Sequence, residues 1–473
     1  MKKKALILLL VLIIAMSSLI ALAACNKEDD KNTITFYHTM GSNLSAVLDE
    51  YIAKFNALYP NNYTIKWEQV GNYDDVRDQI KTELNANKHP NMAYCYPDHV
   101  ALYNAFGATA SLDDYINSTE EITLKDGTKT IVGLTEEQKN DFIQGYYNEG
   151  KQYGDGKMYS MPFSKSTEVL YYNKTFFEDY NKNRKEGEPE LVVPTHWWCT
   201  DACPADCNAS MEKVCKAIKA KDSKYIPLGY DSESNWFITM CEQLGSPYTG
   251  SQDGNRFLFD NDTNKDFVKR FREWYKSGWV TTQSLIGKYT SNLFVNKQSF
   301  MSIGSSAGAV HQRPTQTDGK YPFEVGIASI PQVNQDNPRV ISQGPSICIF
   351  KDSDKEREKT TWLFLKYLTT NVSFQAKFSM QSGYVPVLKS VINEPTYASL
   401  LETADGGDNI AALSAKVCME QEEAYYTSPA FVGSSDARDQ VGKLLAACMS
   451  DDNPDINALF AAAVAECRYA INE

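Results

Sequence analysis

The stretch ITFYHTMGSNLSAVLDEYIAKFNALYPNNYTIKWEQVGNYDDVRDQIKTELNANKHPNMAYCY, residues 34–96, alternates short β-rich runs with segments whose apolar residues recur at helical spacing. The β-rich runs are residues 34–38, 63–69 and 92–96. The helical patterns between them cover residues 44–58 and 74–87. Strand, helix, strand, helix and strand in this order predict a parallel, doubly wound sheet, which places the chain in the α/β class.

Three loops of this stretch follow predicted strands. In a doubly wound sheet, ligands bind just beyond the carboxyl ends of the strands. The loops are therefore predicted to lie near a common site. They are His38-Thr39-Met40-Gly41, Gly71-Asn72-Tyr73 and Tyr96-Pro97-Asp98.

The length and charge of the chain restrict both its architecture and its partners. At 473 residues it exceeds the size at which single hydrophobic cores stop growing, so at least two lobes are expected. Its 60 acidic residues outnumber its 47 basic ones, which argues against nucleic acid and anionic lipid as partners. Aromatic residues make up 12% of the chain, which suits a cleft that stacks rings on a sugar, although most are expected to fill the core.

The N-terminus has the features of a bacterial secretion signal. Lys2, Lys3 and Lys4 precede an uncharged apolar run that ends in Leu22-Ala23-Ala24-Cys25, which resembles the lipobox at which a cysteine thiol receives a lipid. The sequence thus predicts a signal peptide over residues 1–24, lipidation of Cys25 and a polar tether over residues 25–33. Such a protein would be held at the cell membrane, on its extracytoplasmic face. The alternative is a transmembrane anchor, because the apolar run is just long enough to span a bilayer.

Four of the eleven cysteines lie close together: Cys199, Cys203, Cys207 and Cys215. The first three stand at i, i+4 and i+8 and would share one face if the segment were helical. Zinc sites favour C-x2-C pairs with nearby histidines, whereas only His196 is close in this sequence. This spacing favours disulfides or free thiols over a metal, and the sequence predicts no metal site.

Six stretches spread along the chain carry a family resemblance. They are ITFYHTMG (34–41), MPFSKSTEVLYYNK (161–174), FMSIGSSAG (300–308), VISQGPSICIF (340–350), TWLFLKYL (361–368) and SGYVPV (382–387). In this order they resemble the extracellular solute-binding proteins of family 1, the group that includes maltose- and glycerol-3-phosphate-binding proteins. The resemblance covers nearly the whole chain after the N-terminus.

The resemblance implies a two-lobed α/β fold of the periplasmic-binding-protein type II, with the ligand cleft between the lobes. It places residues 34–165 and 332–385 in lobe 1 and residues 166–331 and 386–473 in lobe 2. It implies a monomer that captures a sugar or a glycerol-3-phosphate-type solute by lobe closure and delivers it to the permease subunits of an ATP-driven (ABC) importer. No enzyme activity and no cofactor are expected, and the sequence has no G-x-x-x-x-G-K-[ST] phosphate-binding loop.

The resemblance also implies which residues bind the solute. Serine hydroxyls and backbone N–H groups beside glycine can bind sugar or phosphate oxygens, arginine offers a planar fork for phosphate, and tyrosine combines an apolar face with a polar tip. Glycerol-3-phosphate-binding members have a glutamate where this chain has Pro97, so either Asp98 replaces it or the solute differs. Trp197 or Trp198 either stacks on the solute or packs the lobe. The implied set is Tyr73, Asp98, Ser166, Trp197, Ser305, Gly344, Tyr384 and Arg438.

Two other classes of protein remain as alternatives. Gly304-Ser305-Ser306-Ala307-Gly308 fits the G-x-S-x-G turn of serine hydrolases, in which an acid and then a histidine follow the nucleophile. The only histidine after Ser306 is His311, which leaves no room for the acid between them. The second alternative is a structural or adhesive surface lipoprotein, which neighbouring genes for two permeases and an ATPase would argue against.

Overall fold

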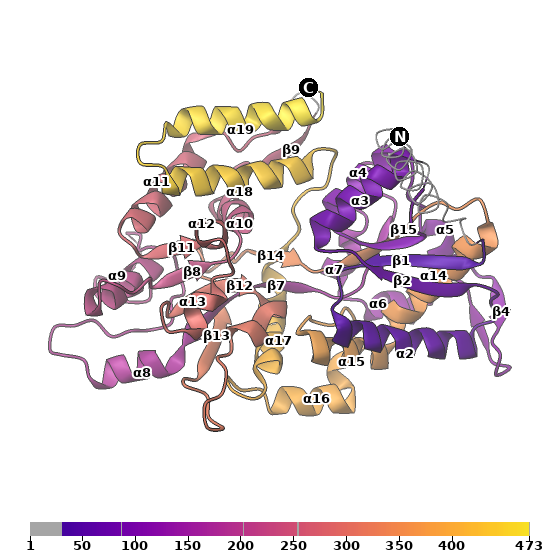
Figure 1. The fold of residues 1–473 in the computed structure, drawn as a ribbon, viewed down its shortest axis with the longest axis horizontal. Helices are drawn as coiled ribbons and strands as arrows, with labels where there is room; N and C mark the ends of the chain where they lie inside the picture. Colours follow the sequence, from indigo (N-terminus) through magenta and orange to yellow (C-terminus); the bar gives the residue numbers. More distant parts are fainter. Residues whose placement is uncertain (1–30, 87, 202, 253–254, 473) are drawn as a thin grey trace, which may run out of the picture.

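The computed structural model describes residues 31–472, apart from residues 87, 202 and 253–254. The predicted signal peptide, the lipidation of Cys25 and residues 25–30 of the tether lie outside the described residues. The described part forms two α/β lobes that stand side by side and are joined by crossing segments (Figure 1). In this part of the chain, no helix has the length and apolar character that crossing a bilayer requires.

Lobe 1 is built on the sheet predicted from residues 34–96. Its five strands follow the order β2-β1-β3-β15-β6. β1 pairs in parallel with β2 and β3, while β15 runs antiparallel to β3 and β6. The strands are β1 (Thr33–His38), β2 (Thr64–Gln69), β3 (Met92–Cys95), β6 (Ser160–Pro162) and β15 (Ser346–Ile349). The three predicted strands and their parallel pairing are confirmed.

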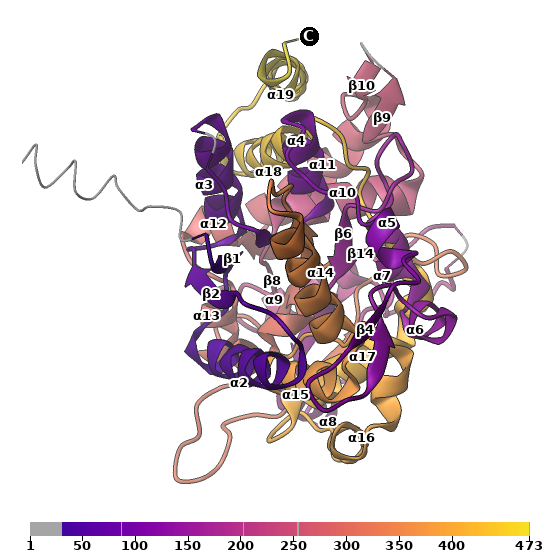
Figure 2. The ribbon, with the colours of Figure 1, turned by 90° about the vertical axis from the view of Figure 1, so that its right-hand side faces the viewer.

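Helices cover both faces of this sheet. Figure 2 looks onto lobe 1 and shows α3 and α4 toward the top and α2 toward the bottom. Ile34 and Phe36 of β1 pack in one cluster with α2 and α14, whereas Tyr37 packs with α3 and α4, because successive strand residues point to opposite faces. The covering helices are α2 (Ser42–Leu58), α3 (Tyr73–Asn85), α4 (Pro97–Ala105), α14 (Lys355–Thr370) and α15 (Val372–Ser382).

A surface excursion follows α4 before the chain returns to the sheet at β6. It begins with a short helix, continues through an antiparallel hairpin and ends in two further short helices. Its elements are α5 (Asp113–Ile116), β4 (Glu121–Thr123), β5 (Lys129–Ile131), α6 (Glu136–Asp141) and α7 (Gln144–Glu149).

Lobe 2 is built on a seven-stranded sheet. Six of its strands follow the order β11-β8-β12-β7-β14-β16, and the seventh, β13, pairs with β7. β7 runs antiparallel to β12, β13 and β14, whereas β8 pairs in parallel with β11 and β12. The strands are β7 (Ser166–Asn173), β8 (Leu228–Tyr230), β11 (Val280–Thr282), β12 (Met301–Ser305), β13 (Val325–Ser329), β14 (Val340–Gln343) and β16 (Tyr425–Tyr426). β9 (Thr249–Gln252) and β10 (Asn255–Phe257) form a separate hairpin.

The remaining helices belong to lobe 2 or follow α15. α10 packs against α18, which also contacts α11 and the C-terminal α19, so these helices cover one end of the lobe (Figure 1). The α-helices are α8 (Lys174–Lys182), α9 (Met211–Lys221), α10 (Glu233–Leu244), α11 (Asp262–Lys276), α12 (Gln283–Ile286), α13 (Ser291–Val295), α16 (Pro395–Glu402), α17 (Ile410–Glu420), α18 (Ser434–Ser450) and α19 (Ile456–Ala470). The 3-10 helices are η1 (Ser306–Gln312), η2 (Lys389–Asn393) and η3 (Glu422–Ala424).

The chain passes from one sheet to the other three times, the third time between β15 and β16, and the first two crossings are neighbours. The chain passes from β6 to β7 through residues 163–165, and from β14 back to β15 beside Gly344. The second crossing therefore falls inside residues 332–385, which the sequence analysis assigned to lobe 1 as a whole. Lys165 is fully buried at the first crossing, and its ammonium group contacts the Glu149 carboxylate at 2.8 Å and the Gly344 carbonyl oxygen at 3.2 Å. The hydrogen bond from Lys165 to Gly344 joins the two neighbouring crossings, and the ion pair ties the first crossing to Glu149 of α7.

Candidate ligand-binding cleft

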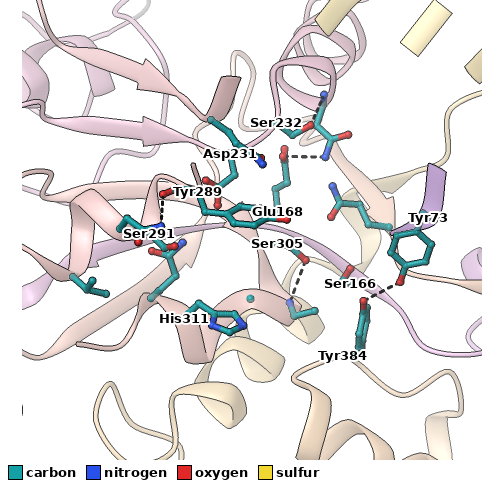
Figure 3. A pocket seen from close by; sticks show the side chains of 18 of the residues that line it. Tyr73, Ser166, Glu168, Asp231, Ser232, Tyr289, Ser291, Ser305, His311 and Tyr384 are labelled. Atoms are coloured by element: carbon teal, nitrogen blue, oxygen red, sulfur yellow. Dashed lines mark hydrogen bonds between the residues drawn. The ribbon is translucent and has the colours of Figure 1, made fainter. Parts of the chain in front are cut away.

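A cavity of about 600 Å³ lies between the two lobes. Its volume falls within the range of about 300–1,000 Å³ that is typical of small-molecule sites. Figure 3 shows side chains from both lobes and from the crossing strand β7 converging on it. The polar and aromatic lining comprises Tyr73, Tyr96, Ser166, Glu168, Asp231, Ser232, Asn235, Gln283, Tyr289, Ser291, Asn292, Ser305, His311, Gln312, Gln343 and Tyr384.

Lobe 1 contributes a tyrosine wall, which consists of Tyr73, Tyr96 and Tyr384. Tyr73 is the first residue of α3, whose start is fixed by reciprocal capping bonds between Asn72 and Asp75. The Tyr73 hydroxyl lies 3.0 Å from the Tyr384 hydroxyl, and the Tyr73 and Tyr96 ring centroids are 4.7 Å apart. Burial raises the pKa of the Tyr73 and Tyr384 phenols, so both stay neutral and keep a proton to donate.

Lobe 2 contributes a carboxylate floor, which consists of Glu168 and Asp231. Glu168 in β7 accepts hydrogen bonds from the Tyr230 hydroxyl at 2.5 Å and from the Asn235 amide at 3.1 Å. Burial raises the pKa of Glu168 to about 7, although these two bonds act to lower it. Asp231 follows β8 and accepts from the backbone N–H and the hydroxyl of Thr290, both at 2.7 Å, and burial raises its pKa as well.

The charges around the cavity restrict what it can hold. Glu168 and Asp231 are acidic, only His311 can become cationic, and no lysine or arginine occurs among the described residues that line it. A phosphate group would meet carboxylates there without a permanent positive charge, which is unfavourable in a partly buried site. Hydroxyl groups, in contrast, find both acceptors and donors in carboxylates, amides and serines. The lining therefore suits a neutral, hydroxyl-rich solute.

A smaller cavity of about 200 Å³ adjoins the first. The two cavities share Tyr96, Asn235 and Gln343 in their linings. Asp98 and Arg438 line only the smaller one. The Arg438 guanidinium donates a hydrogen bond to the side-chain oxygen of Asn235, whose amide also holds Glu168 in the main cavity. Asn235 therefore connects the two cavities.

The positive charge of Arg438 has nearby carboxylates in the smaller cavity. The Asp98 carboxylate accepts from the Ser435 hydroxyl at 2.8 Å and from the His99 backbone N–H at 3.1 Å. Burial acts to raise the pKa of Asp98, but the charges of His99 and Arg438 and the bond from Ser435 outweigh it, so the pKa lies below its usual range. Glu149 lines the same cavity. Two carboxylates thus stand in the cavity that Arg438 lines.

Most of the binding residues predicted from the sequence lie in these two cavities. Those in the main cavity are Tyr73, Ser166, Ser305 and Tyr384. Those in the adjoining cavity are Asp98 and Arg438. The remaining two predicted residues, a glycine and a tryptophan, lie elsewhere.

Gly344 shapes the crossing between the lobes and lines neither cavity. Its φ of +87° lies in the left-handed region, and a Cβ atom there would come within 2.4 Å of the Ser164 carbonyl oxygen. Only glycine fits this close approach without strain. The structure therefore gives Gly344 a role in the backbone path and not the direct solute contact that the resemblance implied.

Trp197 does not face the cleft, so its predicted role in stacking on the solute is wrong. Its side chain has no exposed surface and belongs to the core of lobe 2. The indole N–H donates to the Gln243 side-chain oxygen at 2.9 Å, and the ring lies 6.0 Å from that of Trp236. Trp198 is partly buried and packs under the Arg270 guanidinium at 4.6 Å. Of the two readings considered, packing is the one the structure supports.

Sequence reasoning missed the carboxylate floor. Glu168 stands two positions after Ser166 in a strand, so both side chains point to one face, and this alternation could have revealed it. Asp231 directly follows β8, a strand of only three residues that the sequence analysis did not predict. Asn235, which holds Glu168 in place, is 67 residues away from it in the chain. That contact depends on the tertiary fold.

The serine-hydrolase alternative receives no support from the position of Ser306. Its side chain is fully buried, and its hydroxyl oxygen accepts a hydrogen bond from the Thr167 backbone N–H at 3.1 Å. A nucleophile must reach a substrate carbonyl from an accessible position beside a general base. Ser306 instead joins η1 to β7 below the cleft.

Two lobes, linked by crossing segments around a polar and aromatic cleft, define the class of two-lobed solute-binding proteins. The sequence profile of the bacterial extracellular solute-binding protein family matches residues 50–404. The chain belongs to that family, which consists of binding proteins that act outside the cytoplasm. The predicted family and the predicted two-lobed α/β fold are confirmed.

Individual relatives fall into a glycerol-phosphate group and a sugar group. The sn-glycerol-3-phosphate-binding periplasmic protein UgpB of Escherichia coli K12 is 24% identical over 405 residues, which cover 83% of each chain. UgpB from Mycobacterium tuberculosis, solved in complex with glycerophosphocholine, matches with a TM-score of 0.70 at 17% identity, over 93% of this chain and 98% of that one. The cyclic α-maltosyl-1,6-maltose binding protein from Arthrobacter globiformis has a TM-score of 0.66 at 18% identity, over 93% and 98%.

Proposed function

We propose that this protein captures a sugar or oligosaccharide outside the cell and delivers it to the permease subunits of an ATP-driven importer. One observation carries the choice of solute. The tyrosine wall stands opposite the carboxylate floor, and no lysine or arginine occurs among the described residues that line the main cavity. Sugars present apolar ring faces and hydroxyl edges, which this lining matches. The family and the sugar-binding relatives support the importer role.

Each side of the cleft has its own part in binding. Tyr73 and Tyr96 offer ring faces on which a pyranose can stack, and their hydroxyls stay neutral donors. The oxygens of Glu168 and Asp231 accept hydrogen bonds from solute hydroxyls. Because each carboxylate is already held by two donors of its own lobe, it keeps its orientation before the solute arrives.

Closure of the lobes couples this binding to transport. A solute that touches both the wall and the floor binds the closed form better than the open form, and this difference in affinity shifts the population toward closure. The crossings between the lobes, among them residues 163–165 and Gly344, are where the lobes would move relative to each other. The Lys165 ammonium group, which is paired with Glu149, donates a hydrogen bond to the Gly344 carbonyl oxygen and so joins the two neighbouring crossings.

A second candidate solute is a glycerophosphodiester. Arg438, which lines the adjoining cavity, favours it, because a guanidinium can bind a phosphate through two parallel hydrogen bonds. The similarity to the glycerol-phosphate-binding relatives supports it as well. Against it stand Asp98 and Glu149, which occupy the same small cavity as Arg438.

The proposal includes the way the protein is held outside the cell. Removal of residues 1–24 and lipidation of Cys25 would anchor a monomeric, non-catalytic receptor to the outer side of the cell membrane through a polar tether. Incorporation of a labelled fatty acid checks this step. Label must appear in the native chain and disappear in Cys25→Ala, and an unlabelled native chain would contradict the lipid anchor.

A panel of solutes tests the proposed function. Residues 26–473, which hold every described element, are titrated calorimetrically with maltose-type oligosaccharides, glycerol-3-phosphate and glycerophosphocholine, and heated with each. A solute at a hundred times its dissociation constant adds about 2.7 kcal/mol to the free energy of unfolding. We expect oligosaccharides to bind and Asp231→Asn to weaken their binding. Arg438→Ala removes only a partner of Asn235 and should weaken their binding less.

Two other outcomes are informative. Binding of glycerophosphocholine that disappears in Arg438→Ala would replace the sugar by the second candidate while keeping the importer role. No binding across the panel would contradict both candidates.

A further inference from the structure

The segment between α8 and α9 forms a loop on lobe 2, away from the cleft. Residues 184–209 contain no helix or strand in their described part. Backbone hydrogen bonds close the loop, from the Thr195 N–H to the Ala209 carbonyl at 2.9 Å and from the Met211 N–H to the His196 carbonyl at 2.8 Å. This closure brings His196 beside the cysteines that follow it in the loop.

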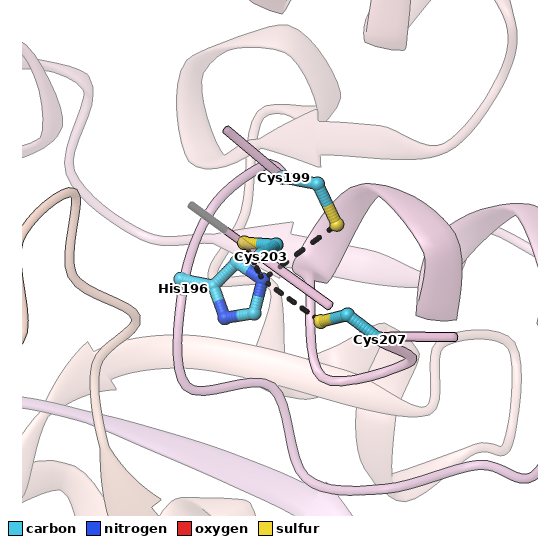
Figure 4. Close-up of side chains that lie close together, drawn as sticks. All are labelled: His196, Cys199, Cys203 and Cys207. Atoms are coloured by element: carbon cyan, nitrogen blue, oxygen red, sulfur yellow. Dashed lines mark hydrogen bonds between the residues drawn. The ribbon is translucent and has the colours of Figure 1, made fainter. Parts of the chain in front are cut away.

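Two turns place the cysteines around the imidazole ring. The Cys203 N–H donates to the Thr200 carbonyl and the Cys207 N–H to the Pro204 carbonyl, each at 3.0 Å. The segment is therefore not the helix on which the three cysteines would have shared a face. Figure 4 shows the three sulfur atoms directed toward the ring of His196. The turns bring together three cysteines whose C-x3-C spacing in the sequence did not indicate a metal site.

The distances match those between the ligands of a tetrahedral metal ion. From His196 Nε2, the Sγ atoms of Cys199, Cys203 and Cys207 lie at 3.8, 3.7 and 3.4 Å, and all four donor atoms lie within 4.8 Å of one another. A tetrahedral zinc ion with Zn–S bonds of about 2.3 Å and Zn–N bonds of about 2.0 Å separates nitrogen from sulfur by about 3.5 Å. The observed mean spacing agrees with this value to a few tenths of an ångström.

We infer that His196, Cys199, Cys203 and Cys207 form a structural zinc site. Four protein ligands complete a tetrahedral shell, as in structural sites, and leave no open position for a water molecule as in catalytic ones. Zinc binds the three cysteines as thiolates, so three protons pass to the solvent. Thiolate donors also select zinc over hard ions such as calcium and magnesium.

The surroundings of His196 fit this role. Its Nε2 faces the sulfur atoms, while its Nδ1 lies 3.3 Å from the Thr195 hydroxyl. That hydroxyl in turn accepts from the Gln335 side chain at 2.8 Å. Histidines that bind metals are oriented in this way through their second ring nitrogen. The Lys213 ammonium group, hydrogen-bonded to the Cys207 carbonyl, stands beside a site whose zinc and three thiolates would carry one net negative charge.

The arrangement differs from that of a disulfide pair. All four clustered cysteines are free thiols, and the fourth, Cys215, is buried in α9 outside the group. A disulfide would join two sulfur atoms and leave the third cysteine and the imidazole outside the bond, whereas a metal ion would bind all four groups. The preference for disulfides or free thiols rested on sequence spacing, which does not show the turns.

The site would fix the loop to the core of lobe 2. His196 directly precedes Trp197, whose ring is buried in that core. None of the four donor residues lines the solute cavity. The zinc inference is therefore independent of the proposed function, and solute affinity should be insensitive to the metal.

Metal analysis of the purified chain tests this inference. Residues 26–473 are prepared under reducing conditions, and zinc is measured by elemental mass spectrometry. We expect one zinc per chain, and none in a variant with Cys199→Ser, Cys203→Ser and Cys207→Ser. Cys215→Ala, a nearby cysteine outside the cluster, should keep full zinc content. His196→Cys should also keep it, because four thiolates still complete the shell.

Cobalt substitution gives a second measurement that does not depend on stability. Cobalt bound to this site should show the intense visible bands of a tetrahedral ion together with thiolate-to-cobalt charge transfer, and the triple serine variant should show neither. Absence of zinc and cobalt from the native chain would overturn the inference. So would a native mass that shows disulfide bonds among these cysteines.

Discussion

The two lobes place their aromatic side chains differently around the same cleft. Lobe 1 exposes the rings of its tyrosine wall at the cavity surface. Lobe 2 buries most of its rings below that surface, where Trp236 stacks on Tyr230 at 4.7 Å and on Phe271 at 3.9 Å, and Trp197 packs beside them. Among the described residues of lobe 2, Tyr289, which is 61% exposed, and His311 bring rings to the cavity.

The difference shows two uses of the same residue type. A ring at the surface can contact the solute, whereas a ring below the surface holds polar groups in position. Tyr230 is an example, because its ring stacks on Trp236 while its hydroxyl donates to Glu168 of the carboxylate floor. Under the proposed function, lobe 1 would supply apolar contact and lobe 2 polar selection.

The largest effect is expected for a buried ring of lobe 2. Trp197→Ala removes a fully buried indole and should lower the free energy of unfolding by about 3–5 kcal/mol in urea titrations. The dissociation constant of the solute should stay within about twofold, because Trp197 lines no cavity. Trp198→Ala, whose ring is partly exposed under Arg270, is the control and should cost about 1 kcal/mol. A large loss of solute affinity in a folded Trp197→Ala variant would show instead that Trp197 contributes to the cleft.

The second effect concerns the carboxylate floor and its dependence on pH. The pKa of Glu168 is raised to about 7 in the fold, so the fold favours the protonated form. This contribution is fully present below the unfolded pKa of 4.5 and is lost as pH rises through about 7. It amounts to about 3 kcal/mol, by the relation between pKa shift and free energy.

Glu168→Gln isolates this contribution. Arg438 and Asp231 also act on the pKa of Glu168, and burial raises the pKa of Asp231 as well, so the difference between native and variant curves is the quantity to measure. Without solute, the variant should gain stability relative to the native chain between pH 4.5 and 8. Parallel stability curves over this range would show that Glu168 does not titrate with a raised pKa.

Local patterns predicted the fold well where they are strong. The strands at residues 34–38, 63–69 and 92–96 were found because β-rich runs alternate with helical periodicity over one continuous stretch. The passage from β14 to β15 was not predicted, since the two strands lie within ten residues of sequence although they join different sheets. Sheet assignment there depends on contacts with distant partners.

The site was predictable only in part, for a related reason. Tyr73 and Tyr384 belong to stretches that resemble the family, and Ser166 follows the crossing that the resemblance placed. Glu168 and Asp231 were missed because their environment is assembled from Tyr230, Asn235 and Thr290, which are far from them in sequence or lie in short unpredicted elements. Trp197 was misplaced because sequence does not distinguish a buried ring from an exposed one.

A third, smaller effect tests the tyrosine wall. Tyr73→Ala removes a ring face and should weaken solute binding about tenfold, since an aromatic contact contributes about 0.5–1.5 kcal/mol beyond its buried area. Calorimetric titration with the best solute of the panel gives the dissociation constant. Tyr153→Ala, a tyrosine of lobe 1 outside both cavities, is the matched control for affinity. Equal affinities of native chain and Tyr73→Ala would show that the wall does not touch the solute.

The smallest effect separates the hydroxyls of the wall from its rings. Tyr73→Phe and Tyr384→Phe each remove one partner of the 3.0 Å hydroxyl pair and should lower the free energy of unfolding by about 0.5–1.5 kcal/mol. Each single change leaves the other hydroxyl without its partner, whereas the double change removes both, so the double variant should cost less than the sum. Additive losses would mean that the two hydroxyls act independently and that the wall is not a unit. Because the rings remain, solute affinity should fall far less than in Tyr73→Ala, which assigns stacking to the ring faces of lobe 1 and leaves hydrogen-bond selection to lobe 2.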